Sequence, residues 1–570
     1  MNLVVIKSII NWLDNNLRIN QTKMNKRIFL LFAFILIIQT FQTKGQGYYW
    51  VSFTDKNSSA FSISDPYEYL SERSIERRTK QNIPIDSLDL PVNSNYIDSI
   101  INVGAELIHS SKWLNGITVK IESAGILSEV SDFTFVSKVQ RTKPLTTTKS
   151  AFNKFKEIVS VEKEPIDTSE YGSSVFQTGL MNGQFLHNQN YNGQGMQIAI
   201  LDAGFLNTDE YLAFDSLWAN NQILGVKDFV NPNSNIFDEH YHGMSVLSCI
   251  GGNVPGKLIG TARKASFWLL RSEDAATEYL IEEDNWIVAA EFADSVGVDI
   301  INSSLGYYDF DDPITNHSYA DMDGKTTRVT QGANIAASRG ILVFSSAGNE
   351  GNNPWKHIIA PADGDNVIAV GATNWAGFAA PFTSHGPASD GDIKPNISAL
   401  GWNTYLQQST GNLGHSSGTS FSSPVLAGMA ACLWQAAPNL TVREIKFAME
   451  ISSSLFLNPD SILGYGIPDF EKAWDLFFPM GVTTQFERKE WFVYPNPVRD
   501  VIVLRKNGVV NSDKITIEIY SLEGRLLQKW IKPNSPGFAL SDIGQLPQGI
   551  FILKISSDKK SQTIKLNKIG

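Results

Sequence analysis

Residues 417–424, with the sequence Ser-Gly-Thr-Ser-Phe-Ser-Ser-Pro, come just before an apolar run of small residues over 425–437. The run predicts a helix, so Ser420 lies at a turn just before the helix or at its N-terminus. Free backbone N–H groups and the positive end of the helix dipole gather at such a position. A serine there can attack a carbonyl carbon while its own N–H helps to hold the oxyanion. A serine that only caps a helix is common in the same place, so this motif does not decide the function alone.

Two more residues of catalytic type stand at the ends of predicted elements. Asp202 ends an apolar strand over 197–201, and His242 opens a helix that continues toward Ile250. The carboxyl-end edge of a parallel sheet is where active sites of α/β proteins form, and an imidazole at a helix start can face the same edge. Taken singly, each residue reads equally well as a solvated loop aspartate or a surface histidine.

A fourth candidate is Asn349, which follows Ser-Ser-Ala-Gly at 345–348, just past another apolar strand. Its side-chain amide could donate to a developing oxyanion. A Gly-Asn pair is also ordinary turn chemistry. Four such motifs in one region, each at a strand or helix end, leave little room for coincidence.

The region that must position these residues alternates short apolar strands with helical patterns. We predict strands over 197–201, 298–302, 341–345 and 367–370, and helices over 286–295 and 332–339. This alternation indicates an α/β fold in which helices cover a parallel sheet.

The order Asp202, His242, Asn349, Ser420 resembles that of the subtilisin-like serine peptidases. The matching motifs are Asp-x-Gly at 202–204, His-Gly-x-x-Val at 242–246, Ser-Ala-Gly-Asn at 346–349 and Gly-Thr-Ser-x-x-Ser-Pro at 418–424. The resemblance implies a three-layer fold in which Ser420 is the nucleophile, His242 the general base and then acid, and Asp202 the group that orients the imidazole. It also implies an oxyanion hole made of Asn349 and the Ser420 N–H.

The same resemblance implies a substrate-binding strand over 301–306, which would pair with an extended peptide backbone. The residues it implies for substrate binding are Ser304, Leu305, Gly306, Ser346, Ala347 and Gly348.

Two positions depart from the family pattern. Ala203 stands where a hydroxyl residue usually follows the aspartate, so other N–H groups must hold that carboxylate. Ile359 falls where the floor of the S1 pocket is expected, and a branched side chain there would favour small P1 residues.

The chain before this region reads as export signal and prosegment. A positive start and an 11-residue apolar run predict a secretory signal over 24–46, with 1–23 an upstream extension from a misplaced start codon or an amphipathic anchor. Strand-like and helix-like patterns over 47–143 predict a small α+β domain, which resembles the inhibitory propeptides of the family in size. Residues 144–170 read as a linker that holds the processing site.

The catalytic region is assigned to 171–478 and a linker to 479–489. Short strands separated by turns over 490–570 predict a small antiparallel β-sandwich. This part resembles the C-terminal sorting domain of the type IX secretion system of Bacteroidetes, through the segments 493–498, 519–525, 546–551 and 565–566. The alternative is an accessory binding sandwich, for instance for carbohydrate.

Composition and motif spacing exclude several other functions. A net charge of −11 with no basic tract argues against nucleic acid as a partner. Ser420 is not in Gly-x-Ser-x-Gly, which argues against an α/β-hydrolase esterase. The acidic and histidine residues at 238–242 and the partial calcium motif at 321–324 lack the spacing of metal sites, so we assign none. Cys249 and Cys432 are expected as buried free thiols, with a disulfide as the alternative.

We therefore expect a secreted serine endopeptidase that acts on polypeptides and is made as a self-processing zymogen. No cofactor is expected for the chemistry, and structural calcium is left open without named ligands. The expected partners are the chain's own propeptide as inhibitor and the Sec and type IX machinery, with localisation outside the cell or on its surface and a monomeric state. The alternatives are a non-catalytic surface protein on the same fold and a processing protease specific for one partner.

Overall fold

The computed structural model describes residues 45–146, 154–155 and 170–478, and most of 491–568. The chain forms two compact units, 1–478 and 479–570. The predicted upstream extension, almost all of the predicted signal and the 479–489 linker lie outside the described residues. In the described part, no helix is long and apolar enough to cross a membrane.

A seven-stranded sheet forms the centre of the first unit, in the order β13-β12-β11-β10-β5-β9-β6, and its paired strands are parallel. The strands are β5 (Gln197–Asp202), β6 (Ile223–Asp228), β9 (Ser266–Arg271), β10 (Ile300–Ser303), β11 (Leu342–Ser346), β12 (Ile368–Thr373) and β13 (Ile397–Leu400). The α/β prediction is confirmed, and each predicted strand matches an observed one within a few residues. Because β5 is the first strand of this sheet in the chain and lies inside it, the strand order reverses there, where α/β folds place their sites.

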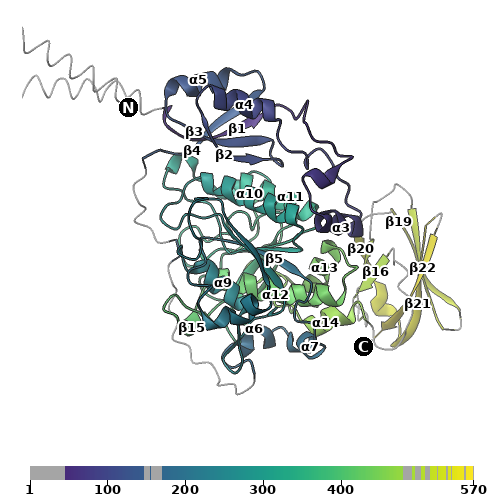
Figure 1. The fold of residues 1–570 in the computed structure, drawn as a ribbon. Coiled ribbons are helices and arrows are strands. Elements are labelled where there is room, and N and C mark those ends of the chain that lie inside the picture. Colours follow the sequence, from purple (N-terminus) through teal and green to yellow (C-terminus); the bar gives the residue numbers. More distant parts are fainter. Residues whose placement is uncertain are drawn as a thin grey trace, which may run out of the picture. The chain divides into compact units, whose positions relative to one another are not determined.

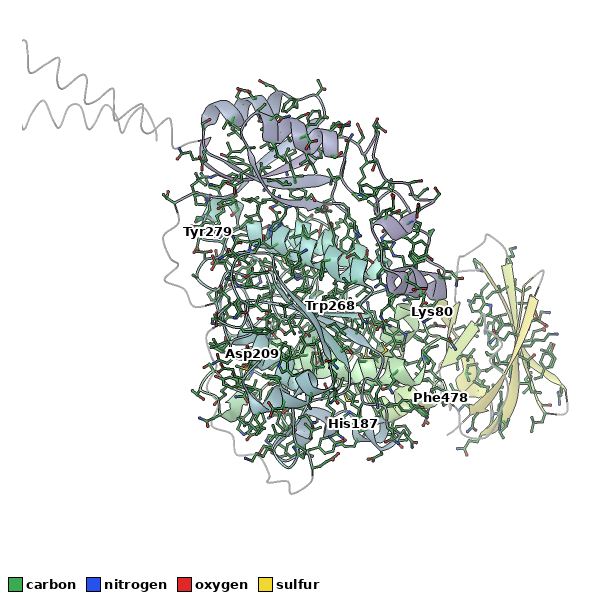
Figure 2. All side chains as sticks on the ribbon, viewed as in Figure 1. Lys80, His187, Asp209, Trp268, Tyr279 and Phe478 are labelled. Atoms are coloured by element: carbon green, nitrogen blue, oxygen red, sulfur yellow. The ribbon has the colours of Figure 1, made fainter. Side chains whose placement is uncertain are left out.

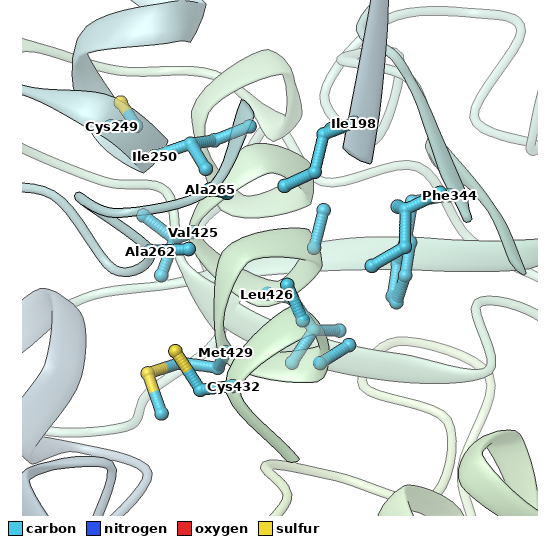
Figure 3. Close-up of a cluster of buried hydrophobic side chains, with 14 of the residues drawn as sticks. Ile198, Cys249, Ile250, Ala262, Ala265, Phe344, Val425, Leu426, Met429 and Cys432 are labelled. Atoms are coloured by element: carbon cyan, nitrogen blue, oxygen red, sulfur yellow. The ribbon is translucent and has the colours of Figure 1, made fainter. Parts of the chain in front are cut away.

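Helices cover both faces of the sheet, as the side chains of β5 show. Ile198 and Ile200 pack into the core shared with α9 (His242–Gly251) and α12 (Thr419–Ala436), part of which Figure 3 shows. Ala199 and Leu201 pack into the opposite core, with α10 (Ile281–Val296) and α11 (Arg328–Ser338). Successive side chains of a strand point to opposite faces, so both faces of β5 are apolar and buried.

The remaining elements of this region are peripheral to the sheet. They are α6 (Val175–Gly179), α7 (Gln184–Asn188), α8 (Asp215–Ala219), β7 (Asn253–Val254), β8 (Leu258–Ile259), β14 (Thr404–Gln407), β15 (Leu413–Ser416), α13 (Val442–Ser452) and α14 (Phe470–Asp475).

The N-terminal block, residues 47–143, is a four-stranded antiparallel sheet in the order β2-β3-β1-β4 with helices packed on it. Its elements are β1 (Gly47–Phe53), α3 (Glu72–Gln81), α4 (Ser94–Asn102), β2 (Glu106–Ser111), β3 (Gly116–Ile121), α5 (Ala124–Asp132) and β4 (Val136–Lys143). Figure 1 shows the block over helices α10 and α11. The predicted α+β character is confirmed.

The second unit consists of two antiparallel sheets, β16-β17-β20 and β19-β18-β21-β22, around one apolar core. The strands are β16 (Trp491–Tyr494), β17 (Ile502–Lys506), β18 (Lys514–Tyr520), β19 (Leu526–Pro533), β20 (Gly537–Leu540), β21 (Gly549–Ser557) and β22 (Lys560–Lys568). The predicted small antiparallel sandwich is confirmed.

Candidate active site

Two glycines, Gly204 after the aspartate and Gly243 after the histidine, let the end of β5 and the start of α9 approach each other. A Cβ on Gly243 would lie 2.5 Å from the Gly204 carbonyl oxygen and 2.8 Å from the Asp202 Cβ. A Cβ on Gly204 would lie 2.4 Å from the His240 nitrogen. Since such distances are shorter than real Cβ contacts, larger residues at either position would push the histidine away from the aspartate.

This approach brings together two residues that are 40 positions apart in the chain. Nδ1 of His242 lies 2.8 Å from Oδ1 of Asp202, and both side chains are buried. With the Nδ1 proton donated to the carboxylate, the neutral ring keeps Nε2 as its proton acceptor. This is the tautomer that a general base needs.

The missing hydroxyl at position 203 has the expected consequence. The backbone N–H of Ala203 donates to Oδ1 of Asp202 at 2.8 Å. Among the residues that the structure describes, Oδ2 of Asp202 has no hydrogen-bond partner although it is buried. The carboxylate is therefore held through one oxygen.

Ser420 is the second residue of α12, so the helix begins six residues before the predicted run at 425. Pro424 lies inside the helix and cannot donate the N–H that would bond to the Ser420 carbonyl. The Ser304 hydroxyl supplies that hydrogen bond instead, at 2.8 Å. Because this hydrogen bond replaces the one that Pro424 removes, the Ser420 carbonyl stays paired where the helix passes through the proline.

The Ser420 side chain contacts the expected substrate strand, and the residue after it contacts the imidazole. Its Oγ donates to the Ser304 carbonyl at 3.3 Å, and the ring of the next residue, Phe421, lies 5.8 Å from the His242 ring. No hydrogen bond joins Ser420 to His242 in the described part of the chain. Catalytic hydrogen bonds are often formed only when substrate is bound, and the hydroxyl can rotate about one side-chain bond.

Asn349 is held with its amide directed at the start of α12. Its Oδ1 accepts hydrogen bonds from the N–H and the hydroxyl of Thr419, at 2.9 and 3.0 Å. The point where Gly418 would carry a Cβ lies 3.6 Å from Asn349 Nδ2 and 3.7 Å from the Ser420 nitrogen. The two nitrogens expected to donate to an oxyanion therefore lie within 4 Å of one point beside Gly418.

The two segments expected to bind substrate enclose the side chain of Ile359. A Cβ on Gly306 would lie 2.3 Å from Ile359 Cδ1, and a Cβ on Gly348 would lie 3.1 Å from it. The N–H of Ile359 donates to the Ala347 carbonyl at 3.3 Å. Ile359, which is 8% exposed, therefore fills the space between the segments that contain Ser304 and Ser346.

Residues 238–242 are used for packing and an ion pair. Glu239 pairs with Arg271 at 3.2 Å. Burial, together with the charge of His242, lowers the pKa of His240 to about 4, so this ring is neutral near pH 7. The carboxylate of Asp323, in the partial calcium motif, accepts the N–H groups of Lys325 and Thr326 and so caps its own turn.

Two groups of three carboxylates lie close enough together to hold a cation in the described part of the chain. One consists of Glu273, Glu278 and Glu282, and the other of the exposed residues Asp365, Asp390 and Asp392. Sequence reasoning missed both: the glutamates lie in one loop and the first turn of α10, the aspartates lie in two separate loops, and neither set has the spacing of a known metal motif.

The two cysteines are buried free thiols, as predicted. Cys249 donates to the Ser245 carbonyl and Cys432 to the Thr261 carbonyl. Burial raises the pKa of both thiols well above the usual value, so neither is a thiolate near neutral pH.

The N-terminal block is attached to α10 by buried ion pairs that the sequence did not reveal. Arg77, Arg78 and Lys112 surround Asp294, with Arg78 at 2.7 Å and Lys112 at 3.2 Å. Glu291 accepts the N–H groups of Lys112 and Trp113. Burial alone would raise the pKa of Asp294, but the three cations outweigh burial and hold it at about 2.

Two residues between the block and the catalytic region, Lys154 and Phe155, lie beside the candidate active site. The ring of Phe155 lies 4.4 Å from the ring of His242 and 4.7 Å from that of His240. The neighbouring Lys154 contacts the glutamates of the first acidic group. Sequence analysis placed a processing site in 144–170 but did not foresee these contacts.

A helix-covered parallel sheet, an Asp–His pair at its switch point and a serine at a helix N-terminus define a serine hydrolase of the subtilisin type. The model of the subtilase family (peptidase S8) matches residues 175–466, and the chain belongs to that family. The peptidase S8 propeptide domain of Bacteroidota matches residues 48–157, and the secretion system C-terminal sorting domain matches 492–568.

Curated relatives agree with this assignment. The chain is 28% identical to subtilisin E of Bacillus subtilis over 324 residues, which cover 55% of this chain and 75% of that protein. It is 28% identical to a subtilisin of Bacillus pumilus over 295 residues, which cover 50% of this chain and 94% of the relative. Serine protease AprX of Bacillus subtilis is 27% identical over 341 residues, which cover 55% of this chain and 72% of that protein. The protein is a subtilisin-like serine endopeptidase, made as a zymogen and carrying a signal for secretion or cell-surface display.

Proposed function

We propose that Asp202, His242 and Ser420 are the catalytic triad of this endopeptidase. The observation that carries the proposal is the 2.8 Å contact between Asp202 and His242, next to a serine at the N-terminus of α12. His242 Nε2 takes the proton of Ser420 while Oγ forms a bond to the scissile carbonyl carbon. The buried Asp202 keeps the ring in the required tautomer and stabilises the imidazolium.

The tetrahedral intermediate then places its oxyanion between two donors, Asn349 Nδ2 and the Ser420 N–H. His242 passes its proton to the leaving amine nitrogen as the C–N bond breaks, which leaves an acyl ester on Ser420. Water, activated by the same imidazole, releases the acid and restores the serine. No cofactor takes part in any of these steps.

The substrate lies extended along Ser304, Leu305 and Gly306, with residues 346–348 on the other side of the P1 side chain. Ile359 fills much of the space between these two segments, so we propose a preference for small P1 residues. Profiling of cleavage sites tests this, and a preference for large aromatic P1 residues would contradict it.

The prosegment, residues 47–143, blocks the enzyme through the linker 144–170, and the enzyme cuts that linker itself. Supporting observations are the ion pairs between the block and α10 and the packing of Phe155 on His242. The catalytic domain is then 171–478. Its substrates are polypeptides, with a broad range or with one partner protein.

The remaining segments serve export. The signal over 24–46 directs the chain through the Sec machinery to the periplasm. The sandwich at 490–570 then directs it across the outer membrane by the type IX machinery and is removed, which leaves a monomeric enzyme.

The test is paired expression of residues 47–478 as wild type and as Ser420→Ala, followed over time by intact-mass analysis. We expect the wild type to lose its N-terminal block by a cut within 144–170 and the variant to remain whole. If neither chain is cut, and wild type freed by an added protease does not degrade denatured casein, the protein is a non-catalytic member of the family.

A further inference from the structure

The glutamate cluster, Glu273, Glu278 and Glu282, is an unusual group of buried like charges. Glu273 and Glu282 have side chains only 2% and 1% exposed, and Glu278 is 15% exposed. One comes from the loop after β9, one from the same loop near its end, and one from the first turn of α10. Burial of three carboxylates together is unfavourable unless a cation accompanies them.

The chain itself supplies that cation. The Lys154 ammonium contacts Glu273, lies 2.6 Å from Glu282 and 3.1 Å from Glu278, and also donates to the Thr277 carbonyl at 2.6 Å. Burial alone would lower the pKa of Lys154, but the carboxylates outweigh burial and hold it well above the usual value. A lysine side chain therefore fits the cluster in length and charge.

Hydrogen bonds connect the loop of the cluster to the expected substrate-binding segment and to the end of β5. The Tyr307 hydroxyl, directly after Gly306, donates to Glu273 at 2.8 Å. The N–H of Ser272, next to Glu273, donates to the Asp202 carbonyl at 3.0 Å. Figure 2 labels Tyr279, the neighbour of Glu278, where the N-terminal block meets the catalytic region.

Only one residue step separates the lysine in the cluster from a residue that contacts the catalytic histidine. Phe155 follows Lys154 directly, and its ring packs on His242 at 4.4 Å. Consecutive Cα atoms are about 3.8 Å apart, so a residue in the cluster lies within a few residues of the scissile bond.

Departure of the linker would leave this pocket without its cation. Even with Lys154 present, burial raises the pKa of Glu278 to about 8, and burial also raises that of Glu282 well above the usual value. A second cation of the same shape would again offset the repulsion.

We propose that Glu273, Glu278 and Glu282 form a subsite that binds a lysine side chain of polypeptide substrates, and that Lys154 occupies it in the precursor. This subsite rests on the proposed protease function and specifies one of its substrate preferences. Substrates with a lysine a few residues from the scissile bond are cut faster than equal substrates without it.

The first experiment measures kcat/KM of the enzyme freed of its N-terminal block, on quenched peptides from P4 to P2′. Lysine replaces norleucine, which has a similar stem and no charge, at one position at a time. We expect one position at which lysine increases kcat/KM at least 10-fold, and a ratio near one in Glu273→Gln and Glu282→Gln. Glu278→Gln is a third, more exposed variant in case the others do not fold. Glu471→Gln, on the surface of α14, is the matched control and keeps the wild-type ratio.

The outcomes separate the subsite from the protease function. Cleavage without a lysine preference at any position overturns the subsite and leaves the protease in place. A lysine preference that survives in the cluster variants also overturns it. Absence of lysine preference together with activity that requires Ca²⁺ and is lost in EDTA would make the cluster a metal site instead. No cleavage of any peptide means that the protease function itself has failed.

A second experiment needs no catalytic activity. In the full-length Ser420→Ala chain, Lys154→Met should increase the rate at which added chymotrypsin cuts after Phe155 by at least 10-fold. Lys154→Arg, which keeps the charge, should change that rate less than threefold. Equal rates in all three chains would show that Lys154 is not held by the cluster and would overturn the proposal.

Discussion

Replacement of Ile359 by alanine should open the space between the two substrate-binding segments. A Cβ on Gly306 would lie only 2.3 Å from Ile359 Cδ1. The Ile359 side chain therefore occupies the space that a large P1 residue needs. Complete burial of a phenylalanine side chain is worth about 1.5–3 kcal/mol. At about 1.36 kcal/mol for each factor of ten, kcat/KM for a P1 phenylalanine should rise about 10- to 150-fold.

The assay compares peptides that differ only in P1, with alanine, leucine or phenylalanine. Wild type should prefer alanine, and Ile359→Ala should reverse the order toward phenylalanine. Ile358→Ala is the matched control, because Ile358 is also buried but packs with Ala347 and Ala388 in a separate cluster. Both variants should lose stability, by about 2–5 kcal/mol for truncation of a buried isoleucine to alanine, so the assay is run well below their melting temperatures.

The reasoning is refuted if wild type already cuts best after phenylalanine. It is also refuted if Ile359→Ala, folded and active on alanine peptides, shows the wild-type order. A reversal in Ile358→Ala as well would attribute the effect to loosened packing and not to the removed side chain.

Further predictions concern the oxyanion hole, the zymogen and the thiols. Asn349→Ala should lower kcat by about 100- to 1000-fold, the magnitude known for an oxyanion-hole asparagine, with KM little changed in steady-state kinetics. Asp294→Asn should destabilise the precursor by about 3–5 kcal/mol in urea unfolding at pH 7, because it removes the carboxylate that pairs with the buried Arg77. The pKa of Asp294 is held at about 2, against about 3.9 in the unfolded chain. The difference in stability should therefore be full above about pH 5 and shrink as the pH falls toward 2, and a constant difference would contradict the assignment. Cys249 and Cys432 should not react with a thiol reagent in the native protein and should react fully in denaturant, and fast native labelling would show that they are not buried.

The local sequence was sufficient for much of the fold. Apolar runs such as 197–201 predicted the strands of the sheet because strands buried on both faces need continuous apolar side chains. His242 at the start of α9 and Ser420 at the start of α12 were both placed correctly. The helical run was predicted to begin after Pro424, because a proline is typical of a helix boundary. In the structure the Ser304 hydroxyl donates the hydrogen bond that Pro424 cannot donate, and α12 continues through the proline.

The sequence by itself determined which residue types stand at the ends of which elements, since hydrophobic periodicity and glycine positions are local properties. Only the tertiary structure decided which of them meet. The contact between Asp202 and His242 depends on how closely two glycines let a strand and a helix approach. Ile359 meets Gly306, which is 53 positions away in the chain, and Lys154 meets glutamates that are more than 100 positions away. Such contacts follow from the packing of the whole sheet, and no local pattern in the chain records them.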